Sequence, residues 1–133
     1  MRYPFDPAAG IVLIKTRIVG PQGEFVFQFA LDTGATTTLV SWSAAVQWSA
    51  AVQAGYDPSI VPDRRTITTG SGVEYCPVVP VERLEALGKA MRHIDVLCHD
   101  LPPSARVDGL LGLNFLSRFD LRINFKQGVI TIR

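Results

Sequence analysis

Apolar and polar residues alternate in short runs along much of this chain of 133 residues. Alternation with a period of two indicates β-strands that bury one face. It is clearest over 25–31, where Phe and Leu occupy every second position. Gly and Pro separate many of the runs, as is typical of turns. The strands predicted in this way are 11–18, 25–31, 38–41, 65–68, 73–75, 78–86, 91–98, 108–112, 121–125 and 129–132.

Two segments depart from the strand pattern. The sequence Trp-Ser-Ala-Ala-Val-Gln occurs twice in succession over 42–53, and Gly55 follows where a helix would end. Because Ala and Gln are good helix formers, we expect one main helix of about three turns here. A short C-terminal helix is expected at 114–118. Strands still dominate, so the prediction is a mostly β, closed barrel-like fold in a single domain over 1–133.

Composition narrows the classes of function. Apolar residues make up 47% of the chain and charged residues 19%, as in globular proteins. A formal net charge of +1 favours neither nucleic acid nor an anionic membrane as partner. We expect no signal peptide in the first residues and no spanning helix, which needs ~20 apolar residues. The expected location is the cytoplasm, with Cys76 and Cys98 as reduced thiols.

The candidate chemistry lies directly after the aromatic strand, where Asp32, Thr33 and Gly34 follow one another. A carboxylate that leaves a strand into a glycine turn is held rigidly and close to other backbone. This geometry suits a carboxylate that works in a pair. The chain has one such segment, so a partner carboxylate would come from a second copy. Taken alone, the triplet is also compatible with an ordinary turn, because Asp and Gly are turn residues.

Two later segments give the triplet its context. Residues 69–72 form the tip of a predicted hairpin, and the apolar strand residues 110–111 end at Gly112, with Asn114, Phe115 and Leu116 behind them. With residues 32–36, these segments resemble the retropepsin-like aspartic proteases, a single-domain class that includes retroviral proteases and their bacterial relatives. The order matches, and the resemblance covers most of the chain from about Val12 onward. A lone Asp-Thr-Gly triplet is weak evidence, but this arrangement is far more specific.

The resemblance implies an aspartic endopeptidase that hydrolyses peptide bonds between two Asp32 carboxylates, one from each protomer of a homodimer. Asp32, Thr33 and Gly34 would be the catalytic residues. Thr33 would hydrogen-bond across the two-fold axis, and Gly34 would donate its N–H toward the carboxylate. The implied partners are a peptide or protein substrate and a second copy, not nucleic acid or a membrane, and no metal or cofactor is implied. The implied substrate-binding residues are Ala35, Thr36, Thr69, Gly70, Ser71 and Gly72.

Some features leave alternatives open. The span from Asp32 to Gly112 is longer than in compact retroviral enzymes, and the hairpin tip is poor in large apolar residues. Residues 129–133 could interleave with those of a partner, as retroviral termini do, or complete the protomer's own sheet. The alternative function is a non-catalytic or latent module for dimerisation or peptide binding on the same fold. Asp108 is interpreted as a turn residue, because neither Thr nor Ser follows it. We interpret each of the two histidines, His93 and His99, as a structural or an exposed residue.

Overall fold

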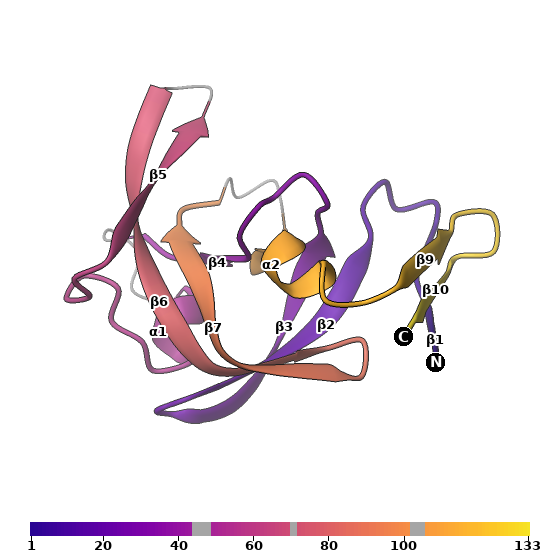
Figure 1. Ribbon diagram of the computed structural model, residues 1–133, viewed down its shortest axis with the longest axis horizontal. Helices are drawn as coiled ribbons and strands as arrows, with labels where there is room; N and C mark the ends of the chain where they lie inside the picture. Colours follow the sequence, from indigo (N-terminus) through magenta and orange to yellow (C-terminus); the bar gives the residue numbers. More distant parts are fainter. Residues whose placement is uncertain (44–48, 70–71, 102–105) are drawn as a thin grey trace.

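The computed structural model describes residues 1–43, 49–69, 72–101 and 106–133. Strands dominate it, and the two helices are short (Figure 1). The strands are β1 (Arg2–Pro4), β2 (Leu13–Gly20), β3 (Gly23–Leu31), β4 (Leu39–Ser41), β5 (Arg64–Thr69), β6 (Gly72–Ala86), β7 (Lys89–His99), β8 (Gly109–Leu111), β9 (Leu121–Asn124) and β10 (Val129–Ile132). The helices are α1 (Ala50–Gln53) and α2 (Leu113–Leu116).

Most of the long strands close into a barrel. Neighbours follow the order β2-β3-β8-β4-β7-β6, and β6 pairs again with β2. This ring therefore leaves no open sheet edge along its circumference. The pairs β3–β8 and β4–β7 are parallel, while the hairpins β2–β3 and β6–β7 are antiparallel. The predicted mostly β, closed barrel-like fold is thus confirmed.

The alternation of residue types in β2 explains which side of the sheet faces inward. Ile14, Thr16 and Ile18 are buried, whereas Lys15 and Arg17 between them are exposed. A one-residue slip in pairing would turn both charges into the core, so the register is strongly specified. The largest fully buried side chains of the core are Phe29, Phe115, Ile18, Leu84, Leu111 and Ile130.

The turn between β6 and β7 contains two residues, Leu87 and Gly88, whose φ angles are +52° and +72°. Two-residue hairpin turns with positive φ at both positions match the right-handed twist of the strands they join. The hydroxyl of Tyr3 lies where a Cβ of Gly88 would be. Glycine therefore allows β1 to pack against this turn.

A smaller sheet holds both chain ends, in the order β1-β10-β9. Its middle strand, β10, has β9 on one side and β1 on the other. Two backbone hydrogen bonds between Asp120 and Arg133 extend the β9–β10 pairing by one residue pair. The termini lie close together at the right of Figure 1. Of the two possibilities for 129–133, the structure shows that this segment completes the protomer's own sheet.

The structure differs from the predicted main helix at its start, where Trp42 and Ser43 are not helical. Helix α1 covers only Ala50–Gln53, and residues 44–48 of the predicted helix lie outside the described residues. Trp42 is not helical, because its N–H donates to the carbonyl of His99 at 2.9 Å and continues the pairing of β4 with β7. The short C-terminal helix is present as α2. No helix in the described part of the chain is long and apolar enough to span a membrane.

The strands predicted separately at 73–75 and 78–86 form one long strand, β6. Pro77 does not interrupt it, and the following residue, Val78, donates its N–H to the carbonyl of Asp63 at 2.9 Å. The first half of β6 pairs with β5 in a hairpin that stands away from the barrel (Figure 1). The second half belongs to the barrel and pairs with β2 and β7.

Candidate functional site

Asp32 lies at the end of β3, where this strand runs parallel to β8. Leu31 pairs with Leu111, and the N–H of Asp32 donates to the carbonyl of Leu111 at 3.0 Å. Continuing this pairing by one residue places Gly112 opposite Asp32. The hydrogen bonds between β3 and β8 therefore hold the backbone of Asp32 in place.

The turn after β3 orients the carboxylate of Asp32. Its Oδ1 accepts a hydrogen bond from the N–H of Gly34 at 2.9 Å, and its carbonyl accepts one from Ala35 at 3.2 Å. A Cβ on Gly34 would lie 3.2 Å from Oδ1, which is tighter than an ordinary contact. The sequence-based expectation that Gly34 donates to this carboxylate agrees with the structure. Thr33 and Gly34 are exposed, so this side of the turn is open to another molecule.

Thr38 and Asn114, to which the sequence analysis gave no role, support this turn through hydrogen bonds. Thr38 is fully buried, and its hydroxyl donates to Asn114 Oδ1 at 2.8 Å and accepts from the N–H of Gly112 at 3.0 Å. The N–H of Thr38 donates to the same Oδ1 at 2.9 Å. Asn114 Nδ2 donates to the carbonyl of Asp95 at 2.8 Å. These bonds tie the 32–38 loop to α2 and to β7.

The backbone of α2 contacts the same loop. The N–H of Leu113 donates to the carbonyl of Ala35 at 2.8 Å, and that of Asn114 donates to Thr36 at 3.1 Å. A Cβ on Gly112 would lie 2.8 Å from the Ala35 oxygen, closer than real contacts occur. Gly112 therefore lets the two segments meet. Ala35 and Thr36 are fixed at the edge of the turn, and their role in substrate binding stays a prediction.

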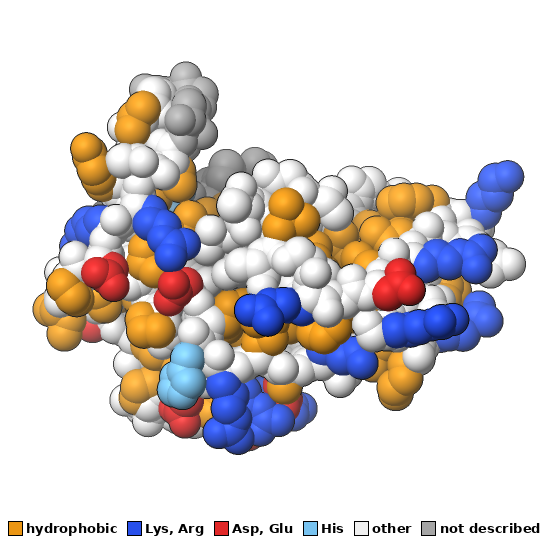
Figure 2. All heavy atoms as spheres, in the orientation of Figure 1, with side chains coloured by type: hydrophobic (Ala, Val, Ile, Leu, Met, Phe, Trp, Pro, Cys, Tyr) orange, Lys and Arg blue, Asp and Glu red, His pale blue; other side chains and the backbone are white. Residues whose placement is uncertain are grey.

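The predicted hairpin tip is described only at its two ends. Thr69 pairs with Gly72 in the β5–β6 ladder, and Gly72 has a φ of +121°. Gly70 and Ser71 lie outside the described residues. The hairpin and the 32–38 loop both extend toward the upper side of Figure 1. Few Lys, Arg, Asp or Glu side chains lie along the middle of that upper edge in Figure 2.

Asp108 is a structural residue. Its Oδ2 accepts from the N–H of Gln28 at 2.9 Å, and its own N–H donates to the Gln28 carbonyl at 2.8 Å. The parallel register places Asp108 beside Gln28, and therefore four positions before Asp32 along β3. At ~3.3 Å per residue the two positions are about 13 Å apart. Asp108 cannot pair its carboxylate with that of Asp32 in the same chain.

The histidines differ in their surroundings. His93 is exposed on β7, with a φ of +53°. His99 has Nδ1 at 2.7 Å from the carbonyl of Asp100, and its Nε2 contacts a carboxylate oxygen of Glu74. His99 thus connects the end of β7 to the hairpin strand β6. Among the described residues, no three His, Cys, Asp or Glu side chains group as a metal site would require.

Both cysteines are free and buried. Burial raises the pKa of the Cys98 thiol to about 12, and burial also raises the pKa of the Cys76 thiol. Because the thiolate is the nucleophile, neutral buried thiols are poor candidates for catalysis. The cytoplasmic location stays a prediction.

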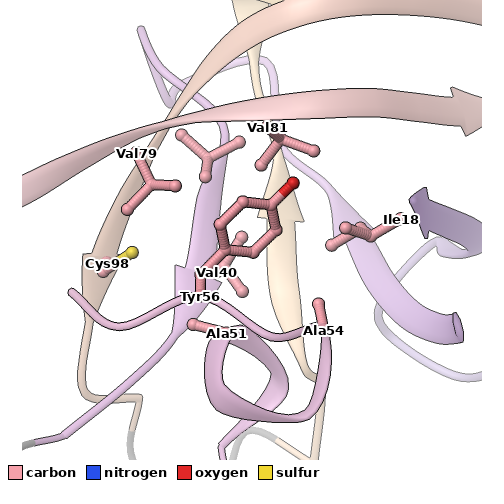
Figure 3. A pocket seen from close by; sticks show the side chains of 9 residues that line it. Ile18, Val40, Ala51, Ala54, Tyr56, Val79, Val81 and Cys98 are labelled. Carbon is pink, nitrogen blue, oxygen red and sulfur yellow. The ribbon is translucent and has the colours of Figure 1, made fainter. Parts of the chain in front are cut away.

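The small cavity in Figure 3 is a packing feature. It holds about 10 Å³ and is lined by apolar side chains around the ring of Tyr56. A space of this size holds about one water molecule at most. The Tyr56 hydroxyl donates to the carbonyl of Val19 at 3.1 Å and accepts from the N–H of Glu82 at 3.0 Å. Burial raises the pKa of this phenol, which stays neutral and connects the segment after α1 to β2 and β6.

The chain is similar to known proteins in sequence and in structure. The family model described as gag-polyprotein putative aspartyl protease matches residues 22–118. The fold is similar to the crystal structure of a retropepsin-like aspartic protease from Rickettsia conorii, with a TM-score of 0.70. That match covers 99% of this chain and 88% of the other at 20% sequence identity, which supports the fold alone. No curated protein matches this sequence.

Proposed function

Because this chain belongs to the gag-polyprotein putative aspartyl protease family, we propose that it is an aspartic endopeptidase whose active site is completed by a second copy. The family assignment also confirms the resemblance drawn from residues 32–36, 69–72 and 110–116. One observation supports the proposal most directly. Asp32 sits at the end of a central barrel strand, with one carboxylate oxygen held by Gly34 and the turn exposed on its outer side.

The need for a second copy follows from the position of Asp32. Water activation of this kind uses two carboxylates at short range. Asp108 lies four strand positions away and accepts a hydrogen bond from Gln28, so it does not supply the second carboxylate. The Asp32 of a second copy, related by two-fold symmetry, would supply it. The exposed Thr33 is then free to hydrogen-bond the loop of the other protomer across the axis.

The chemistry follows from the electrostatics of the pair. Two carboxylates a few ångströms apart cannot both ionise at low cost, so they share one proton and titrate together. The ionised member takes a proton from a bound water, whose oxygen attacks the scissile carbonyl carbon. The protonated member donates its proton to the carbonyl oxygen, giving a tetrahedral intermediate. Its collapse breaks the C–N bond, and the nitrogen leaves as an amine after taking a proton. No covalent acyl-enzyme forms.

The substrate would be an extended peptide. It would lie between the β5–β6 hairpin tip, residues 69–72, and the floor formed by Ala35 and Thr36. Binding would depend on hydrogen bonds to the peptide backbone, as in other modes that recognise extended chains. Closure of the two tips, one from each protomer, would exclude solvent from the reaction.

Cleavage of a peptide library by Asp32→Asn and Asp108→Asn tests the proposal. Asp32→Asn removes the charge and nearly keeps the shape, so cleavage should vanish while the circular dichroism spectrum is unchanged. Asp108→Asn should retain cleavage, because an amide oxygen can still accept from Gln28. If the wild-type dimer cleaves no peptide, or if Asp32→Asn cleaves as well as wild type, the non-catalytic or latent peptide-binding module replaces this proposal.

A further inference from the structure

A wide groove lies on the outer face of the barrel. It has a volume of about 840 Å³ and runs over β2, β3 and β6, with β1 and the β6–β7 turn at its side. Among the described residues, none from 32 to 36 lines it, and neither does Thr69 or Gly72. The groove is a feature of the fold itself, and the inference drawn from it does not rest on the proposed protease activity.

The groove contains an excess of positive charge. Arg17 and Arg83 share the carboxylate of Glu85, with N–O distances of 3.2 Å and 2.5 Å. Lys15 and Lys89 also line the groove, and neither has a carboxylate within 4.0 Å among the described residues. Four cations therefore face one anion on a chain whose formal net charge is only +1.

Apolar side chains lie among these charges. Val26 pairs with Arg17 across β2 and β3 and is 58% exposed, a large value for an apolar side chain in a barrel strand. Leu13 lies further along the same groove and is half-buried, whereas Leu87 at its side is buried. Cations beside the exposed Val26 and the half-buried Leu13 complement a ligand that carries both acidic and apolar groups.

The middle of the groove has its backbone engaged on both sides. Residues 16–19 of β2 pair with β3 on one side and with β6 on the other. The segment Arg83–Ala86 of β6 likewise pairs with both β2 and β7. A ligand cannot join the sheet as an added strand along these two segments, because each is paired on both sides. Recognition over them has to come from the side chains, which makes it dependent on the charges.

We propose that this groove binds an extended segment of a partner protein that presents both acidic and apolar side chains on one face. Carboxylates would meet Lys15, Lys89 and the two arginines, and apolar side chains would cover Val26 and Leu13. A nucleic-acid backbone fits less well. Its phosphates form a continuous anionic line that would pass over Glu85, and its bases would gain little from aliphatic side chains.

The test is fluorescence anisotropy with a short fluorescein-labelled peptide of Glu-Glu-Leu-Leu repeats, which in an extended conformation carries Glu and Leu on each face. A second peptide carries Lys in place of Glu, and a labelled oligothymidylate represents nucleic acid. Binding is measured to the full wild-type chain and to Asp32→Asn, so that any cleavage of the probe by wild type is recognised. The groove variant is Lys15→Glu with Lys89→Glu, each lysine also being changed alone, and the control matched in charge to each single variant is Lys126→Glu, an exposed lysine outside the groove. Val26→Ser is a second, uncharged groove variant that changes an already exposed side chain.

We expect saturable binding of the Glu-Leu peptide, equal in wild type and Asp32→Asn, and weakened by added salt. The double lysine variant should weaken it by at least about tenfold and Val26→Ser by a few fold, while Lys126→Glu should change it by less than about twofold. The proposal is overturned if the Glu-Leu peptide does not bind, or if groove and control variants lose affinity equally. Tighter binding of the oligothymidylate, lost in the same groove variants, would assign the groove to nucleic acid instead.

Discussion

Thr38 and Asn114 are joined by two hydrogen bonds that converge on one side-chain oxygen. The backbone N–H and the hydroxyl of Thr38 donate to Asn114 Oδ1 at 2.9 Å and 2.8 Å, and the same hydroxyl accepts from Gly112 at 3.0 Å. Because Thr38 is fully buried, no water can replace these bonds. This pair connects the loop that carries Asp32 to the strand and helix beneath it.

Thr38→Val should therefore destabilise the protein by about 1–3 kcal/mol, because it leaves the N–H of Gly112 buried without an acceptor. Urea denaturation measures this loss. Thr36→Val is the matched control, since Thr36 is exposed and its change should stay within about 0.5 kcal/mol. Equal midpoints for the two variants would show that the Thr38 hydroxyl does not support the loop.

Gly112→Ala should lower both stability and activity. The added Cβ would lie 2.8 Å from the Ala35 oxygen and 2.8 Å from the Thr37 carbonyl carbon, and backbone atoms on both sides prevent easy relaxation. The expected cost is about 1–3 kcal/mol, as for other overpacked sites. Thermal unfolding of the purified variant measures it. An unchanged unfolding temperature would mean that the loop and α2 are not in close contact.

Gly34→Ala should separate activity from stability. The turn is exposed, so the fold should tolerate a methyl group, with a change in unfolding free energy below about 1 kcal/mol. The Cβ would lie only 3.2 Å from Asp32 Oδ1 and would disturb the carboxylate. Peptide cleavage should fall at least about tenfold, which corresponds to 1.4 kcal/mol of transition-state stabilisation. Full activity in a stable variant would contradict the assigned role of Gly34.

The buried thiols should resist alkylation in the folded protein. Burial raises the pKa of Cys98 to about 12, so at pH 8 nearly all of this thiol is neutral, and burial also raises the pKa of Cys76. Iodoacetamide reacts with the thiolate, and labelling should be slow until urea unfolds the chain. Mass spectrometry counts the labelled sites. Labelling of the folded protein as fast as that of an unfolded one would contradict this burial.

Specific activity should fall on dilution, because one protomer holds one Asp32. The fold should persist, since β10 is paired on both sides within its own chain and does not depend on a partner. Sedimentation gives the dimer dissociation constant, and circular dichroism monitors the fold at each dilution. Constant specific activity far below that dissociation constant would argue for an active monomer.

The sequence predicted the parts of the fold that depend on local pattern. The alternation of Ile14, Lys15 and Thr16 identifies the inner face of β2. The position of Asp32 at the end of a strand was predictable from the aromatic alternation over 25–31. The role of Thr38 was not predictable, since Thr36, Thr37 and Thr38 look alike until burial distinguishes them. Its bonds to Gly112 and Asn114 depend on segments distant in sequence.

Local helix propensity over 42–53 also failed to locate the start of the helix. Trp42 continues the β4–β7 pairing through its bond to His99, and this tertiary contact outweighs local propensity. Strand β1 was missed because three residues carry too little pattern, and it forms by pairing with β10 at the other end of the chain.

The most direct test of the central claim, a catalytic pair of Asp32 carboxylates from two protomers, is a mixing experiment. Wild type and Asp32→Asn are combined in equal amounts at fixed total concentration, allowed to exchange subunits, and assayed for peptide cleavage. Random pairing leaves about one quarter of the dimers with two intact aspartates. Activity should therefore fall to about one quarter of that of wild type alone at the same total protein concentration. Activity of about one half would mean that each protomer works alone and would contradict the shared site.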